Sequence, residues 1–210
     1  MKLFDRYRKE TKKEKERTLL SRVVKYNESQ YRKDIQDWRD ALAAAKSPLM
    51  PRQRLLQEIY TSVMTDALLS SQMQYRTDRS QNTTFCLLDA GGKTDEKSTA
   101  WLKDSGIYDT LSEAIIEAKF YGQSVMELAF DNGNPVFRML PRTHIEPVNG
   151  IFYPDVFSGD GEKYRERPDY GTWILEFNTK EEDYGLLNSI TPHVLMKRFA
   201  QSCWSCFKNY

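Results

Sequence analysis

Histidine and cysteine are scarce in this chain of 210 residues, which has two of the first and three of the second. Three cysteines do not make a disulfide framework. Cys203 and Cys206 have a C-x-x-C spacing, but His193 lies ten residues earlier, about 15 Å away along a helix, too far to share a metal with them. We therefore expect no metal and no cofactor, and we interpret Cys203 as part of a buried helix face.

Long apolar runs and an excess of one charge are also missing. No segment approaches the roughly 18 to 20 consecutive apolar residues that cross a bilayer. The first residues, Met1-Lys2-Leu3-Phe4-Asp5, are followed by charged residues instead of an apolar run, so we expect no secretory signal. The chain has 31 Lys and Arg residues and 30 Asp and Glu residues, so its net charge is only +1. These absences predict a protein of a reducing cytoplasm with no membrane partner, and they exclude a dedicated DNA-coating protein.

Basic residues are concentrated at the start of the chain. Residues 1–29 are predicted to form a basic, partly disordered arm whose apolar cluster lies at residues 19–24. Two interpretations stay open, namely a solvated tail and a surface that makes salt-sensitive contacts with phosphate groups or an acidic partner. The residues that would make such contacts are Arg6, Arg8, Lys12, Lys13, Lys15 and Arg17.

We expect residues 30–210 to form one domain, and helices are predicted in its first part. Apolar residues at helical spacing predict a helix from Tyr31 to Ala45. Pro51 fits the first position of a second helix that ends near Ser71. A third helix is expected around residues 101–104. A fourth opens at Thr110 with a capping box, and its inward-facing residues are expected to be Leu111, Ile115, Ala118 and Phe120.

Strand signals dominate the later part of the chain. Strands are expected within residues 74–88, 124–130, 136–140, 147–153 and 172–177. The second and third of these segments flank Asn132-Gly133, which is typical of a two-residue hairpin turn. An amphipathic helix follows from about residue 190. The sequence therefore predicts an α+β fold of N-terminal helices, a β-meander of hairpins and a final amphipathic helix.

Few motifs carry chemistry. Gly91-Gly92-Lys93-Thr94 is similar to part of a phosphate-binding loop, but Leu87 stands where that loop requires glycine, so we interpret it as a turn. His144 and Glu146 would share one face of a strand, as an acid and base pair could, but no nucleophile accompanies them. The acidic residues 181–183 are interpreted as a solvated turn. We therefore expect no catalytic residue and no enzymatic activity.

Three segments carry a likeness to a known family. They are Arg54–Tyr60 with its continuation at residues 66–70, the helix-to-strand turn at residues 118–128, and residues 184–187 with 197–200. Leu140-Pro141-Arg142 lies between them. In these segments the chain resembles the portal proteins of tailed bacteriophages, in particular the Mu-like branch, and the likeness runs from about Tyr31 to Cys203.

The resemblance implies a structural role. Portal proteins form a ring at one capsid vertex, and double-stranded DNA is packaged and ejected through it. The implied partners are other portal subunits, terminase, capsid proteins, head-completion proteins and the DNA itself. The implied location is the virion, with the host bacterial cytoplasm during assembly. Apolar helix faces would then pack between subunits, and the candidates for this packing are Tyr31, Ile35, Trp38, Leu42, Phe199 and Trp204.

The end of the chain departs from the family pattern. Family members continue after the helix of Trp204 into a stem, a clip and a crown, whereas here the register is lost at residues 206–210. We therefore expect a truncated prophage product that keeps the N-terminal wing portion. Two alternatives stay open: a small nucleic-acid-binding protein that uses the basic arm, and an enzyme built around His144 and Glu146.

Overall fold

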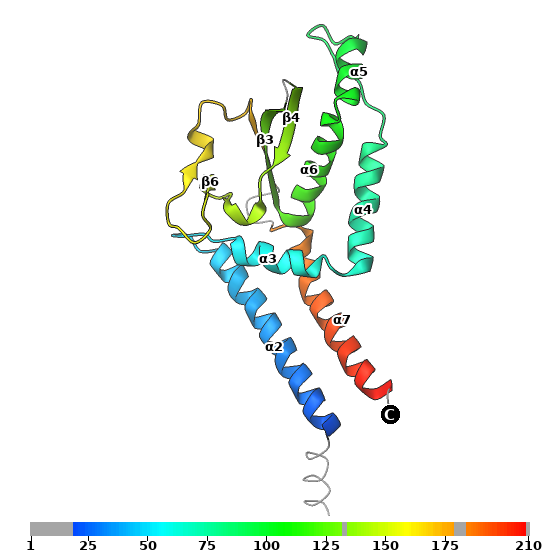
Figure 1. The fold of residues 1–210 in the computed structure, drawn as a ribbon, viewed down its shortest axis with the longest axis vertical. Helices are drawn as coiled ribbons and strands as arrows, with labels where there is room; N and C mark the ends of the chain where they lie inside the picture. Colours follow the sequence, from blue (N-terminus) through cyan, green and yellow to red (C-terminus); the bar gives the residue numbers. More distant parts are fainter. Residues whose placement is uncertain (1–18, 132–133, 179–183, 209–210) are drawn as a thin grey trace, which may run out of the picture. The chain divides into compact units, whose positions relative to one another are not determined.

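A computed structural model describes residues 19–131, 134–178 and 184–208 of the chain (Figure 1). Its helices and small antiparallel sheets, followed by a C-terminal helix, confirm the α+β class. The chain divides into two compact units, one from Ala41 to Ile190 and one from the described parts of residues 1–40 and 191–210. Across the described ranges, no helix combines the length and the apolar character that a membrane span requires.

The smaller unit contains most of α2 (Leu19–Ala45) and most of α7 (Leu186–Lys208). α2 confirms the helix predicted from Tyr31 and extends it back to Leu19, so that residues 19–29 of the predicted arm belong to it. Residues 1–18 lie outside the described residues. α7 confirms the predicted final helix. Within this unit the rings of Tyr31 and Phe199 stack with their centroids 4.9 Å apart.

The larger unit begins with two helices where the sequence predicted one. α3 (Arg54–Val63) ends at Val63, and α4 (Ala67–Gln81) starts after Asp66. Asp66 has an extended backbone, and its carboxylate accepts a hydrogen bond from the Leu69 amide at 3.3 Å, which caps α4. The predicted start at Pro51 is also wrong, because Gln53 is the residue that precedes the first helical turn.

α4 replaces the strands predicted within residues 74–88. On the exposed face of α4, the side-chain amide of Gln74 donates a hydrogen bond to the Asp78 carboxylate, four residues later, at 2.7 Å. Thr77 is buried, and its hydroxyl donates to the Met73 carbonyl at 3.2 Å. α4 packs along α6 (Ile107–Tyr121). Most of the strand-favouring residues behind the prediction lie at 83–88, after α4 ends at Gln81. Only β1 (Leu87–Leu88) is extended, paired with β2 (Thr94–Asp95).

α5 (Glu96–Asp104) confirms the third predicted helix, whereas the fourth begins earlier than predicted. Gly106, with a φ of 71°, is the residue before α6, so the capping box at Thr110 was wrong. The Thr110 hydroxyl instead donates to the Gly106 carbonyl inside the first turn. Ala118 and Phe120 are buried as predicted, but Ile115 is exposed because the buried face of α6 runs through Ala114.

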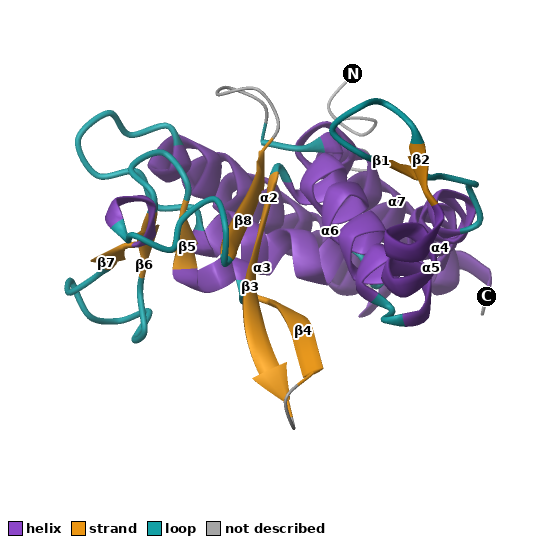
Figure 2. Cartoon of the chain, turned by 90° about the horizontal axis from the view of Figure 1, so that it is seen from above, coloured by secondary structure: helices purple, strands orange, loops and turns teal. Residues whose placement is uncertain are grey.

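A three-stranded sheet lies beside α6. β3 (Gln123–Asp131) pairs with β4 (Asn134–Met139) in the predicted hairpin, although its turn residues 132 and 133 lie outside the described residues. β8 (Ile174–Asn178), the strand predicted at residues 172–177, returns to the other edge of β3. Figure 2 shows α6 on one side of this sheet and the small sheet β5-β6-β7 on the other.

The small sheet contains the strand predicted within residues 147–153, which is β6 (Ile151–Phe152). β6 pairs with β5 (Ile145–Glu146) on one edge and with β7 (Glu162–Lys163) on the other. Two short 3-10 helices flank it, η1 (Arg142–His144) and η2 (Tyr164–Glu166). Between the two sheets lies a core cluster of Val125, Ile145, Tyr164 and Ile174.

Candidate functional site

His144 and Glu146 hold a turn instead of forming an acid and base pair. His144 ends η1, so the two residues do not share one strand as predicted. The His144 Nδ1 atom lies 2.7 Å from the Tyr153 carbonyl oxygen. Glu146 is buried, and its carboxylate accepts hydrogen bonds from the amides of Val148 at 2.6 Å and Asn149 at 3.0 Å. Both side chains therefore stabilise the hairpin between β5 and β6.

The Gly-Gly segment is a turn whose amides are occupied. One carboxylate oxygen of Asp89 accepts from the amides of Gly91 at 2.8 Å and Lys93 at 2.9 Å. Gly92 has a φ of 78°, which favours glycine. Because Asp89 fills the position where a phosphate would bind, the turn interpretation is confirmed. Across the part of the chain that the structure describes, no three His, Cys, Asp or Glu side chains are grouped to hold a metal.

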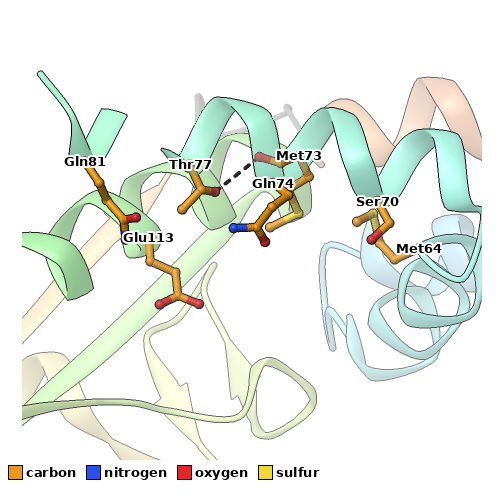
Figure 3. Close-up of a pocket in the computed structure, with 7 residues that line it drawn as sticks. All are labelled: Met64, Ser70, Met73, Gln74, Thr77, Gln81 and Glu113. Atoms are coloured by element: carbon orange, nitrogen blue, oxygen red, sulfur yellow. Dashed lines mark hydrogen bonds between the residues drawn. The ribbon is translucent and has the colours of Figure 1, made fainter. Parts of the chain in front are cut away.

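A pocket of about 190 Å³ lies along the seam between α4 and α6 (Figure 3). Figure 3 shows Gln74, Thr77 and Gln81 of α4 on one side and Glu113 of α6 on the other. Glu113 is the one ionisable side chain among the residues that line it, together with Met64, Ser70 and Met73. Its single exposed carboxylate lies among amides and thioethers, so the pocket lining offers no acid and base pair.

A different set of residues joins the three segments of the family likeness. We call Gln57, Tyr60, Gly122 and Gly185 the glycine junction. Gln57 and Tyr60 of α3 are completely buried. The Gln57 amide donates to the Tyr121 carbonyl at 3.1 Å, and the Tyr60 hydroxyl donates to the Tyr184 carbonyl at 3.0 Å. α3 therefore binds the backbone immediately before each glycine of the junction.

The two glycines allow the backbones to cross in contact. Gly122 and Gly185 have φ angles of 91° and 81°, in the left-handed region. A Cβ atom on Gly185 would lie 2.3 Å from the Phe120 carbonyl oxygen and 2.4 Å from the Gly122 nitrogen. A Cβ atom on Gly122 would lie 2.8 Å from the Tyr184 carbonyl carbon. Both positions therefore require glycine for conformation and for space.

Several buried amide groups next to the junction lack hydrogen-bond partners. Gln123 is only 1% exposed, and neither its side-chain oxygen nor its side-chain nitrogen has a partner among the described residues. The side-chain oxygens of Gln57 and Asn188 are in the same state within those ranges. An unpaired buried polar group costs about 1–3 kcal/mol. These amides therefore reduce the stability of the region that the junction holds together.

Arg142 connects the Leu-Pro-Arg step to α6. Its guanidinium forms an ion pair with Glu117 and lies 3.7 Å from the ring centroid of Tyr121. Burial raises the pKa of the Tyr121 hydroxyl, the charge of Arg142 opposes this rise, and Glu117 adds to it. Because Glu117 and Tyr121 are one helical turn apart, one guanidinium contacts both and fixes the end of β4 against α6.

Glu176 of β8 is the centre of the densest polar network. Arg165 donates to both carboxylate oxygens of Glu176, at 2.6 and 2.9 Å. The hydroxyls of Tyr164 and Tyr170 donate to the same carboxylate at 2.8 and 2.9 Å. Burial favours the neutral form of Glu176, but these hydrogen bonds and one from Asn178 outweigh it and lower the pKa of the carboxyl. The network ties η2 to β8.

Sequence reasoning missed this network although a signal was present. Glu176 follows Ile174 by two residues in a strand, so both side chains face the same side of the sheet. Because Ile174 is buried in the core cluster, a carboxylate on that side requires partners. The glycine junction was missed for a different reason, since its partners are far apart in the sequence and only its segments were noted.

The residues predicted to pack between subunits have different environments. Tyr31, Ile35, Trp38, Leu42 and Phe199 are half-buried within the chain, and Tyr31 contacts Phe199. Trp204 is 73% exposed and is available to a partner. The candidate contact residues of the basic arm, from Arg6 to Arg17, lie outside the described residues.

The chain matches a known protein family. The family model described as the portal protein of Mu bacteriophage matches residues 57–208, which is more than half of the chain. No curated protein and no solved structure matches the chain. The matched range starts at Gln57 and includes all four residues of the glycine junction.

Proposed function

The chain belongs to the family of Mu bacteriophage portal proteins, and we propose that it is a subunit of the ring through which double-stranded DNA enters and leaves the phage head. The family is structural, and its members assemble with other head components in the virion. The observation that carries the proposal is the family match across residues 57–208, a range that contains the whole glycine junction.

A structural role agrees with the kind of site that this chain builds. The carboxylates of Glu146 and Glu176 in the larger unit bind neighbouring amide, hydroxyl and guanidinium groups of the same chain. Carboxylates bound in this way stabilise the fold and are not available for a reaction. We therefore propose that the protein has no enzymatic activity of its own and that the force for packaging comes from terminase.

The near-zero net charge supports a conduit. A surface that neutralises many phosphates binds DNA tightly and slows its movement, whereas a net charge of +1 over 210 residues does not. We propose that DNA passes the assembled protein without being held. The proposed partners are further copies of this chain, terminase, capsid proteins and head-completion proteins, which it meets in the host cytoplasm during assembly.

The oligomeric state tests the proposal. We expect the purified chain to form closed rings, visible by negative-stain electron microscopy and by mass photometry over a dilution series. A ring requires a contact between two different surfaces of neighbouring subunits. A protein that stays monomeric at every concentration would contradict the proposal.

A further inference from the structure

Two surfaces of the larger unit expose large apolar side chains and carry opposite charges. The loop surface consists of Leu49 before α3 and Asp155, Phe157 and Asp160 between β6 and β7. The α4 surface consists of Leu68, Tyr75 and Arg79. We propose that the loop surface of one copy of this chain docks on the α4 surface of the next copy, which would make this pair the subunit contact of the ring.

The loop surface presents a fixed aromatic side chain. Phe157 is 82% exposed and Leu49 is 90% exposed. The Phe157 amide donates to the Asp155 carboxylate at 2.9 Å, and the guanidinium of Arg54 lies 4.3 Å from the Phe157 ring centroid. The Arg54 contact also joins the Phe157 loop to the helix that follows Leu49. Because Phe157 is already held in place, docking would lose little conformational entropy.

The α4 surface is a stripe along one helix. Leu68, Tyr75 and Arg79 are separated by seven and four residues, which places them on one face. Leu68 is 65% exposed and Tyr75 is 59% exposed. The seam pocket uses other residues of the helix, among them Met73 and Thr77, so this stripe is left uncovered by α6. These two exposed apolar side chains and Arg79 share one face of α4, and this face is the candidate interaction surface.

Charge favours a neighbouring copy as the occupant. Asp155 and Asp160 are the carboxylates of the loop surface, and the nearby Arg54 is already paired with Glu58, so this surface is negative. Arg79 gives the α4 surface a positive charge. Asp160 and Arg79 are exposed, and neither makes an ion pair with a residue in the described ranges. Each surface would therefore supply the counter-charge that the other lacks, and complementary potentials fix the register of a contact.

The positions of the two surfaces agree with a ring. Figures 1 and 2 show the β6–β7 loop at the left edge of the larger unit and α4 at the right edge, with the sheet and α6 between them. A contact between two different surfaces is heterologous, and it leaves one free copy of each surface after every addition until the ring closes. The inference therefore deepens the proposed function and rests on it.

Cysteine cross-linking tests the pairing directly. Cys86, Cys203 and Cys206 are first replaced by serine, and Phe157→Cys and Tyr75→Cys are introduced in separate chains. We expect oxidation of the mixture to give a cross-linked dimer, and each variant alone to give none. The control pairs Phe157→Cys with Ser70→Cys, an exposed position on the pocket side of α4. Cross-linking of Phe157→Cys with itself, or equal cross-linking of the control pair, would overturn the inference.

A charge exchange gives a second measurement. We expect Arg79→Asp and Asp160→Arg each to raise the concentration for half-assembly at least tenfold, and the double variant to restore it. Phe157→Ser should weaken assembly similarly, whereas Trp101→Ser, which removes an exposed aromatic outside both surfaces, should not. Circular dichroism checks that each variant is folded.

The outcomes separate the two proposals. If the unaltered chain assembles and none of these variants shifts assembly, the pairing of the two surfaces is wrong while the portal function stands. If the unaltered chain is monomeric at every concentration, both are wrong.

Discussion

Replacing Gly185 by alanine should strongly destabilise the larger unit. The left-handed backbone at φ 81° costs alanine about 1–2 kcal/mol. The new methyl carbon would also lie 2.3 Å from the Phe120 oxygen and 2.4 Å from the Gly122 nitrogen, which are both backbone atoms. Overpacking of this kind costs about 1–3 kcal/mol, so the expected loss in the free energy of unfolding is about 2–5 kcal/mol.

Gly92→Ala is the matched control. Gly92 has nearly the same φ, 78°, but a methyl group there meets no atom within 4 Å. Its expected loss is therefore only the backbone term of about 1–2 kcal/mol. Urea denaturation followed by circular dichroism measures both variants against the unaltered chain. Equal losses for the two variants would refute the reasoning, because the close approach of the two backbones at the junction would then contribute nothing.

Three further predictions concern buried polar groups and the arm. Gln123→Met should raise the free energy of unfolding by about 1–2 kcal/mol because it removes unpaired amide atoms. Gln57→Met should lower the free energy of unfolding because the hydrogen bond to the Tyr121 carbonyl is lost. Equal effects of the two variants in urea denaturation would contradict this reasoning. The lowered pKa of Glu176 adds stability that is complete above its ordinary value of 4.5 and is lost as pH falls below that value. Glu176→Gln should therefore lower the free energy of unfolding at pH 7 by about 3 kcal/mol and reduce its dependence on pH in the acid range. Glu162→Gln, at an exposed carboxylate, should change the free energy of unfolding little. If Glu176→Gln left the pH dependence of stability unchanged, the role of the network would be refuted. If the arm contacts DNA, deletion of residues 1–18 should abolish salt-sensitive DNA binding in fluorescence anisotropy, and equal binding with and without the arm would exclude that role.

Local sequence patterns predicted the elements whose signal does not depend on a distant part of the chain. The stripe from Tyr31 to Ala45 identified α2 because a 3.6-residue period needs no knowledge of the partner. Asn132-Gly133 located the hairpin of β3 and β4 because the turn fixes the register of its strands. The capped start of α4 at Asp66 was missed because one aspartate after an apolar stretch is a weak signal.

Long-range contacts account for what the sequence could not predict. Only Tyr75 and Thr77 favour a strand within residues 74–81, and these residues belong to α4, which packs along α6. The Tyr60 hydroxyl binds a carbonyl 124 residues later, and no periodicity reports such a pair. The candidate packing residues from Tyr31 to Trp204 were selected by apolar spacing, which cannot distinguish the side chains that pack within the chain from those left for a partner.

The crossing at Gly122 and Gly185 also sets an order of events during synthesis. Gly185 follows Gly122 by 63 residues, so at about 5–20 residues per second the ribosome makes it roughly 3 to 13 s later. During this interval α3 and the start of β3 are already made, but the backbone that Tyr60 binds does not yet exist. Nascent chains arrested before Tyr184 should therefore be cut by protease within α3 more readily than the released full-length chain. Closing of the junction would then be the last step in completing the larger unit.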